Sequence, residues 1–294
     1  MTSPRVNPII KKDLKVISRS MKYSWGLFAY EAVLALIFLI ALSMINTINS
    51  YGYVAQNTEI YTAYVAFFPV LAISELCIIA IIIPIITASS ISGERERKTM
   101  DVLLTTTISS RSIILGKITS AVIRVMMFVI ASIPLLSVSF IVGGMSWLSL
   151  FEFLILACFF AFFAGSIGIF CSSICKKSIT SIILSYVIYF GIYGVSFVPM
   201  IFAAVYDSDE ALFFTFLLQA GNPVMSFVAF FMKVVTGESL ASTFYYSNYS
   251  IFTSKFGQIL FSTGGWLTLS IIVQAAIAAL FIWGAAMRIK PGKK

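Results

Sequence analysis

Two long apolar runs, separated by one densely charged stretch, restrict most strongly what this chain can fold into. The runs are Tyr64–Ser90 and Ile118–Val142, and the stretch between them, Ile91–Lys117, reads ISGERERKTMDVLLTTTISSRSIILGK. A helix of about 20 apolar residues is long enough to cross the hydrocarbon core of a bilayer. The charged stretch is too costly to place in hydrocarbon, so we expect it to project into water between two membrane spans.

The composition extends this interpretation to the whole chain. Of its 294 residues, 60% are hydrophobic and 11% are charged, whereas a soluble domain carries about 25% charged residues. The apolar segments are continuous rather than alternating, which disfavours a β-barrel. The sequence therefore predicts an all-α, polytopic membrane protein with a single transmembrane domain over residues 1–294.

We expect six membrane spans joined by short polar connections. Asn7-Pro8 is typical of a helix start, and the basic face that follows predicts an amphipathic helix over residues 7–22 in the headgroup plane, with a solvated basic tail as the alternative. Gly221-Asn222-Pro223 divides another apolar segment into two pieces too short to cross. We interpret these as short re-entrant helices within an extracellular segment, residues 206–264. The predicted spans are residues 25–45, 63–90, 118–142, 148–171, 180–205 and 265–287.

The positions of the lysines and arginines predict the orientation. With the N-terminus inside, all of them except Lys233 and Lys255 lie on or near the cytoplasmic side, as the positive-inside rule favours. This placement accounts for the net charge of +8 without a nucleic-acid partner. We therefore expect a multi-pass protein of the cell membrane, in contact with the lipid bilayer, with both termini in the cytoplasm.

The first part of the charged stretch has the pattern of a short helix. Met100, Leu103 and Leu104 form an apolar patch at i, i+3 and i+4, and charged residues surround the start of the segment Glu94–Leu104. A helix this short is not stable alone in water. We therefore expect its patch to dock into a groove on a partner.

This stretch resembles the loop between the second and third spans in the type-2 permease subunits of ATP-binding-cassette (ABC) transporters. That loop reads approximately Ile-x-x-Glu-[Arg/Lys]-Glu-x-x-Thr-x-x-x-Leu-Leu-x-[Ser/Thr]-Pro, and a Gly-Lys pair opens the third span. Thr107 stands where the family usually has proline. Asn7-Pro8, the six-span layout and Asn222-Pro223 add to the likeness. The matching residues of the loop are Ile91, Glu94, Arg95, Glu96, Thr99, Leu103, Leu104, Thr106, Ser109, Gly116 and Lys117.

The resemblance implies the permease of an ATP-driven exporter. Residues 92–108 would carry a coupling helix that docks on a separate ABC ATP-binding subunit, and a second permease copy or a sister permease would complete the path. The chain has no Gly-x-x-x-x-Gly-Lys-[Ser/Thr] phosphate loop. We therefore expect it to be no enzyme and to hold no cofactor, with ATP and Mg²⁺ bound by the partner. The expected cargo is a peptide, a drug or another amphipathic small molecule. The expected coupling interface comprises Glu94, Arg95, Glu96, Arg97, Thr99, Met100, Leu103 and Leu104.

Three ionisable residues lie inside predicted spans, where charges are costly and often functional. Glu31 and Arg124 fall at matched depth, about 9–10 Å from the cytoplasmic boundary, and we predict a structural salt bridge between them. Glu75 lies roughly 27 Å above the charged stretch, where it either faces the translocation path or lies near the outer surface. An ion-coupled secondary transporter or channel that uses Glu75 is the alternative function. Without histidine, we expect no metal site and no intramembrane enzyme.

Small residues predict where the spans approach one another. Without a side chain, a glycine lets two membrane helices come into close backbone contact. The glycines at suitable positions are Gly165, Gly168, Gly191 and Gly194.

Overall fold

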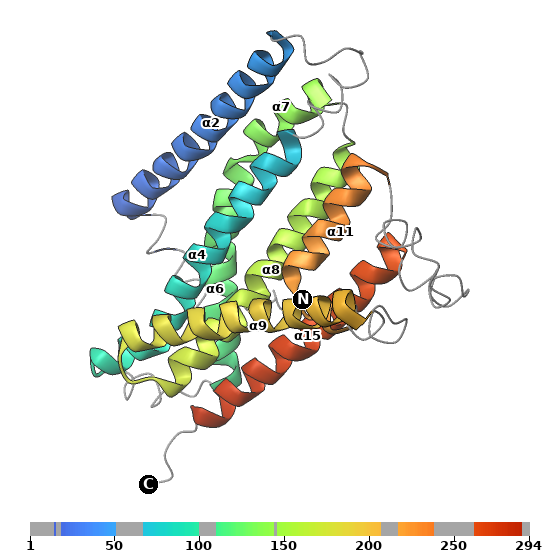
Figure 1. Cartoon of the computed structure of the whole chain (residues 1–294). Coiled ribbons are helices and arrows are strands. Elements are labelled where there is room, and N and C mark those ends of the chain that lie inside the picture. Colours follow the sequence, from blue (N-terminus) through green and yellow to red (C-terminus); the bar gives the residue numbers. More distant parts are fainter. Residues whose placement is uncertain are drawn as a thin grey trace, which may run out of the picture.

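The computed structural model describes residues 15, 19–50, 67–99, 110–143, 146–206, 217–237 and 262–289. Within these ranges the regular structure is entirely helical, and six helices are long and apolar enough to cross a membrane. The prediction of an all-α protein with six spans is therefore confirmed (Figure 1). The helices are α2 (Met21–Ser50), α4 (Phe67–Glu96), α6 (Ser110–Ala131), α7 (Ile133–Gly143), α8 (Trp147–Ile174), α9 (Ser178–Tyr206), α11 (Pro223–Val235) and α15 (Thr263–Arg288).

The predicted interfacial helix, residues 7–22, lies largely outside the described residues. Its last two residues, Met21 and Lys22, already belong to α2, so the first span helix begins four residues before Trp25. In Figure 1, α2 stands to one side of the other helices. Only 11% of its most apolar window is buried, which leaves most of its surface for lipid or for another subunit.

Helices α4 and α8 form the centre of the bundle and pack closely because α8 presents small residues to α4. A Cβ atom at Gly168 would lie 2.0 Å from Thr87 Oγ1 and 3.2 Å from the backbone nitrogen of Ala88, whereas one at Gly165 would make ordinary contacts of 3.5 Å or more. Gly191 and Gly194 of α9 have no neighbouring atom within 4 Å of such a Cβ in the described part of the chain. Close helix contact through glycine is therefore a property of α8 and not of α9 within this subunit.

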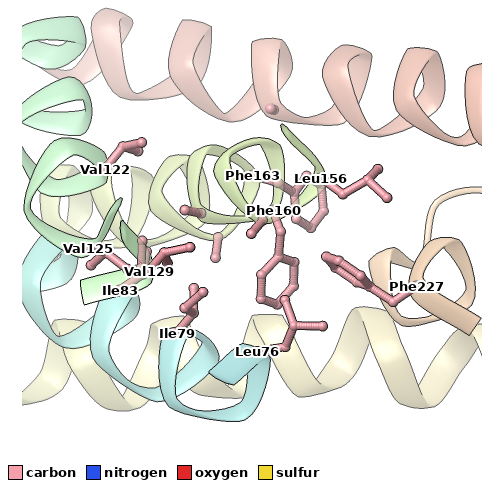
Figure 2. Packing of buried hydrophobic residues seen from close by; sticks show 14 of the residues in the cluster. Leu76, Ile79, Ile83, Val122, Val125, Val129, Leu156, Phe160, Phe163 and Phe227 are labelled. Carbon is pink, nitrogen blue, oxygen red and sulfur yellow. The ribbon is translucent and has the colours of Figure 1, made fainter. Parts of the chain in front are cut away.

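The core around this pair is built from branched aliphatic and aromatic side chains of several helices. Figure 2 shows Phe160 of α8 between Leu76 of α4 and Phe227 of α11. The Phe160 and Phe227 rings meet edge to face, with centroids 5.5 Å apart, an arrangement that aromatic pairs prefer. On the other side of this contact, the same cluster continues through Ile79, Ile83, Val122, Val125 and Val129.

Span three is not one straight helix, because it bends at Ser132 between α6 and α7. Pro134 has no N–H to donate to the Ile130 carbonyl, and its ring crowds the preceding turn. The Ser132 hydroxyl oxygen lies at the bend, 2.8 Å from the carbonyl oxygen of Val129 and 2.9 Å from Glu75 Oε1. The bend therefore brings a buried polar group of span three into contact with span two.

Pro84 lies inside α4. A proline there removes the hydrogen bond to the Ala80 carbonyl. The hydroxyl of Tyr186 on α9 donates to the neighbouring Ile81 carbonyl at 2.5 Å. The Ile81 carbonyl therefore accepts a hydrogen bond from α9 in the turn of α4 where the proline disturbs the backbone hydrogen bonds.

Helix α11 is an apolar helix of 13 residues, too short to cross the bilayer. Asn222 caps it by accepting from the Val224 N–H at 2.9 Å, and Pro223 occupies the first turn. The Asn222 amide also donates to Ser196 Oγ on α9 at 2.6 Å. Gly221-Asn222-Pro223 therefore marks the start of α11, as predicted, while most of the preceding half of the re-entrant pair falls on residues outside the described ranges.

Candidate functional site

The charged motif Glu94-Arg95-Glu96 is the end of α4, which continues six residues beyond the predicted end of span two at Ser90. The Thr99 N–H donates to the Glu94 carbonyl at 2.9 Å, and the Lys98 N–H donates to the Arg95 carbonyl at 3.0 Å. These two bonds form the Schellman pattern that ends many helices. Glu94 and its neighbours are therefore part of a long, continuous helix.

The prediction of one short helix over Glu94–Leu104 is wrong in its first half. Lys98 has a φ of 56°, in the left-handed region, and a right-handed helix cannot continue through such a residue. The chain leaves the axis of α4 at this point. Met100, Leu103 and Leu104, which carry the predicted apolar patch, lie outside the described residues.

Replacing Lys98 with glycine should stabilise the protein. Glycine adopts a positive φ without a Cβ clash, so we expect Lys98→Gly to raise the free energy of unfolding by about 0.5–1 kcal/mol. Thermal melting of the purified protein in detergent measures the change. Arg97→Gly is the matched control, because Arg97 does not have a positive φ, and it should lower the melting temperature. If both substitutions changed the melting temperature equally, the positive φ of Lys98 would not be the cause, and this explanation would be contradicted.

Five residues at this end of the bundle, which we call the charged rim, connect α4 to its neighbours: Glu94, Arg95, Glu96, Lys117 and Ser178. The Nζ atom of Lys117 on α6 donates to Glu94 Oε1 at 2.7 Å and to the Ser90 carbonyl at 3.0 Å. The Lys117 side chain is only 10% exposed. This bond is stronger than a typical surface ion pair because water is largely excluded from one partner.

The next two residues of α4 bind the ends of two other helices. Arg95 Nη1 donates to the carbonyl of Cys175, which caps the C-terminus of α8, at 3.1 Å. The Glu96 carboxylate accepts from the N–H and the hydroxyl of Ser178, the first residue of α9, at 3.1 and 2.7 Å. A cation at a helix C-terminus and an anion at an N-terminus both complement the helix dipole. The rim therefore joins α4, α6, α8 and α9 in one bonded unit.

A second contact lies one turn above the rim. The hydroxyl oxygen of Ser172 on α8 accepts from the N–H groups of Ile91 and Ser92 on α4, both at 2.9 Å. Ile91 and Ser92 are fully buried. This contact fixes the height of α8 relative to the end of α4.

The outer surface of the rim is available to a partner. Glu96, Arg97, Lys98 and Thr99 are exposed, although the Glu96 carboxylate is bonded to Ser178. The Thr99 hydroxyl donates to the Glu94 carbonyl at 3.2 Å and helps to end the helix. The predicted coupling residues that the structure describes therefore divide into two kinds: those that bind neighbouring helices and those that face outward.

The sequence of residues 8–283 matches the family described as ABC-2 family transporter protein. The match covers nearly the whole chain and includes both the rim and α11. The chain belongs to the ABC-2 transporter family. It is therefore a multi-pass membrane protein that forms part of a transporter. A comparison with curated proteins found no significant match.

The salt bridge predicted between Glu31 and Arg124 of this ABC-2 protein is wrong, because Glu31 pairs with no cation in the described ranges. The Tyr23 hydroxyl, not Glu31, lies beside Arg124 and donates to its carbonyl at 3.0 Å. Glu31 instead lies near enough to Glu75 to act on it electrostatically. The neighbouring Tyr30 packs its ring on Phe128, with centroids 5.3 Å apart, so Glu31 lies more than one turn further from the rim than Arg124.

Glu75 is fully buried, with 0% of its surface exposed. Its side chain therefore reaches no surface of the part of this subunit that the structure describes, and the two predicted places for it stay predictions. Lys233, one of the two exceptions to the predicted charge distribution, forms a salt bridge of 2.9 Å with Glu152. This bond joins α11 to α8.

Proposed function

We propose that this ABC-2 protein is the permease subunit of an exporter and that the charged rim receives force from a separate ABC ATP-binding subunit. The observation that carries the proposal is the set of three bonds made by consecutive residues of α4. Glu94 binds α6, Arg95 binds the end of α8, and Glu96 binds the start of α9. A displacement applied next to the rim would be transmitted to four helices together.

In this proposal the rim faces the cytoplasm, as the distribution of lysine and arginine favours. The outward residues Arg97, Lys98 and Thr99, with the segment that follows them, form the contact with the ATP-binding subunit. ATP binding closes two such subunits and pushes the rims of two permeases, either two copies of this chain or this chain and a sister. The cargo path lies between the two permeases.

An amphipathic cargo is supported by an apolar cavity of about 320 Å³ between α4, α8, α9 and α11. Its walls include Phe160, Phe227 and two tyrosines, Tyr189 and Tyr193, whose rings meet edge to face with their centroids 4.4 Å apart. Ligand sites in proteins are commonly apolar cavities of this size with a few polar groups. The hydroxyl groups of both tyrosines are buried, so the cavity wall is almost wholly apolar and suits the apolar part of such a cargo.

The decisive experiment is co-purification of the tagged protein with its ATP-binding partner. We expect Leu103→Asp to abolish recovery of the partner, because a charge in the apolar pattern that follows the rim would have to be buried in the docking groove. Leu103→Met, which keeps the apolar volume, should retain the partner. An ion-coupled transporter would carry cargo without any ATPase and would tolerate both substitutions, so that result would overturn the proposal.

A further inference from the structure

Glu75 lies where the first three spans meet, in the half of α4 remote from the charged rim. Its Oε1 atom bonds Ser132 at the bend between α6 and α7, at 2.9 Å. The hydroxyl of Tyr30 on α2 lies close to the same carboxyl group and to Ser132. Neither Glu75 Oε2 nor the Tyr30 hydroxyl forms a well-aligned hydrogen bond with any described residue. Glu75 is completely buried, and only 6% of the surface of Tyr30 is exposed.

No cation balances this carboxyl group within the described ranges. The ionisable groups that act on Glu75 are Tyr30 and Glu31, both from α2, and Glu31 has the same sign of charge. The other helices packed against α4, namely α6, α7, α8 and α9, add no further ionisable group to this set. An ionised carboxylate that is buried without a counter-charge is strongly disfavoured, and such a group becomes neutral instead.

The hydrogen-bond geometry independently indicates a neutral carboxyl group. Ser132 Oγ lies 2.9 Å from Glu75 Oε1 and 2.8 Å from the carbonyl oxygen of Val129. A serine hydroxyl has one proton, and neither a carboxylate nor a carbonyl can donate one. If Glu75 carries a proton, it donates to Ser132 Oγ, and Ser132 then donates to Val129. Both short contacts become full hydrogen bonds only in that arrangement.

We propose that Glu75 is a proton-binding site of this permease and that its proton holds α4 to the bend of span three through Ser132. Because the site is enclosed by α2, α4 and the bend, the proton can pass to water only when these helices separate. Proton release is therefore coupled to opening of this seam. The inference rests on the buried cluster alone and stands or falls independently of the ATP-driven function.

Infrared difference spectroscopy tests the proposal directly. The protein in lipid nanodiscs at pH 7 is compared with Glu75→Gln, which is the neutral isostere and should fold normally. We expect the wild-type spectrum to contain the carbonyl stretch of a protonated carboxylic acid that the variant lacks, and Ser132→Ala to shift this band without removing it. Glu152→Gln is the control, because Glu152 is paired with Lys233 and should lose carboxylate bands only. If Glu75→Gln instead lost carboxylate bands, Glu75 would be ionised in the wild type, and the proposal would be overturned.

The pH dependence of thermal stability gives a second measurement. The unfolded chain releases a glutamate proton at about pH 4.3, so a folded protein that keeps the Glu75 proton loses stability as pH rises. Between pH 6 and pH 7, we expect the melting temperature of the wild type to fall by about 2–4 °C more than that of Glu75→Gln. Identical pH profiles would overturn the proposal. A melting temperature that rises with sodium or potassium only when Glu75 is present would also overturn it, because the carboxylate would then bind a metal cation.

Discussion

Gly168→Ala is expected to destabilise the protein by about 3 kcal/mol, because the added methyl group has no space between α4 and α8. Its Cβ would lie 2.0 Å from Thr87 Oγ1 and 3.2 Å from the backbone nitrogen of Ala88. The threonine is held by a bond of 2.8 Å from its hydroxyl to the Ile83 carbonyl, and the backbone cannot move without displacing α4. Thermal melting and the yield of monodisperse protein in detergent measure the effect.

Gly165→Ala is the matched control for this prediction, since its new Cβ would make only ordinary contacts with Thr87 and Ile118. We expect it to change stability by less than about 1 kcal/mol. Thr87→Ala should recover part of the loss caused by Gly168→Ala, because it removes the nearest atom but leaves Ala88 in place. If both glycine substitutions had the same cost, the close approach at Gly168 would not be what limits packing.

Glu94→Lys is expected to have the second large effect, because it places two like charges where Lys117 now binds Glu94 at 2.7 Å. Breaking a largely buried ion pair costs about 3–5 kcal/mol. Glu94 is 28% exposed, so we expect about 2–3 kcal/mol here. If the proposed function holds, the variant should still bind the ATP-binding subunit but transport poorly. Stability is measured by thermal melting, and coupling is measured as ATP hydrolysis stimulated by cargo.

A charge swap distinguishes the ion pair from other effects of these substitutions. Combining Glu94→Lys with Lys117→Glu restores opposite charges and should recover part of the stability. Recovery should be incomplete, because Lys117 also donates to the Ser90 carbonyl at 3.0 Å, and a carboxylate at position 117 cannot do so. Strictly additive losses in the double variant would mean that the two side chains do not interact.

The membrane spans could be predicted from the sequence because hydrophobic length is a local property. Each span needs only enough consecutive apolar residues, and six such segments are present. The extent of α4 could not be predicted in the same way. Its last residues are charged, and the residue that terminates it, Lys98, has a positive φ, a conformation in which glycine is the usual residue. Neither feature has a clear local signal.

Whether Glu31 pairs with Arg124 could not be predicted, because distance along one helix does not fix its height relative to another helix. In the structure the rings of Tyr23 and Tyr30 both pack on Phe128, with centroids 5.2 and 5.3 Å apart from it. Glu31 is therefore more than one turn further from the rim than Arg124. A single contact between α2 and α6 would have corrected the register, but no such contact can be read from one sequence.

The bonds of the charged rim could not be predicted from the sequence either, because they join residues that only the fold brings together. Glu96 and Ser178 are 82 residues apart, and the sequence indicates only that both lie near membrane boundaries. The prediction that Glu94, Arg95 and Glu96 belong to the coupling region stays a prediction, since no partner is present. What the structure adds is a second role, because each of these residues also binds a neighbouring helix.

The length of α4 has a mechanical consequence. A helix of 30 residues is about 45 Å long, whereas the hydrocarbon core is about 30 Å thick, so about one third of α4 stands outside it. Pro84 lies inside this helix, about 18 Å from Glu96. A tilt of about 10° at Pro84 would swing Glu96 sideways by about 3 Å. The end of α4 can therefore act as a lever arm that pivots at Pro84, within the bilayer. Its movement would carry the three helices bonded to the rim, α6, α8 and α9.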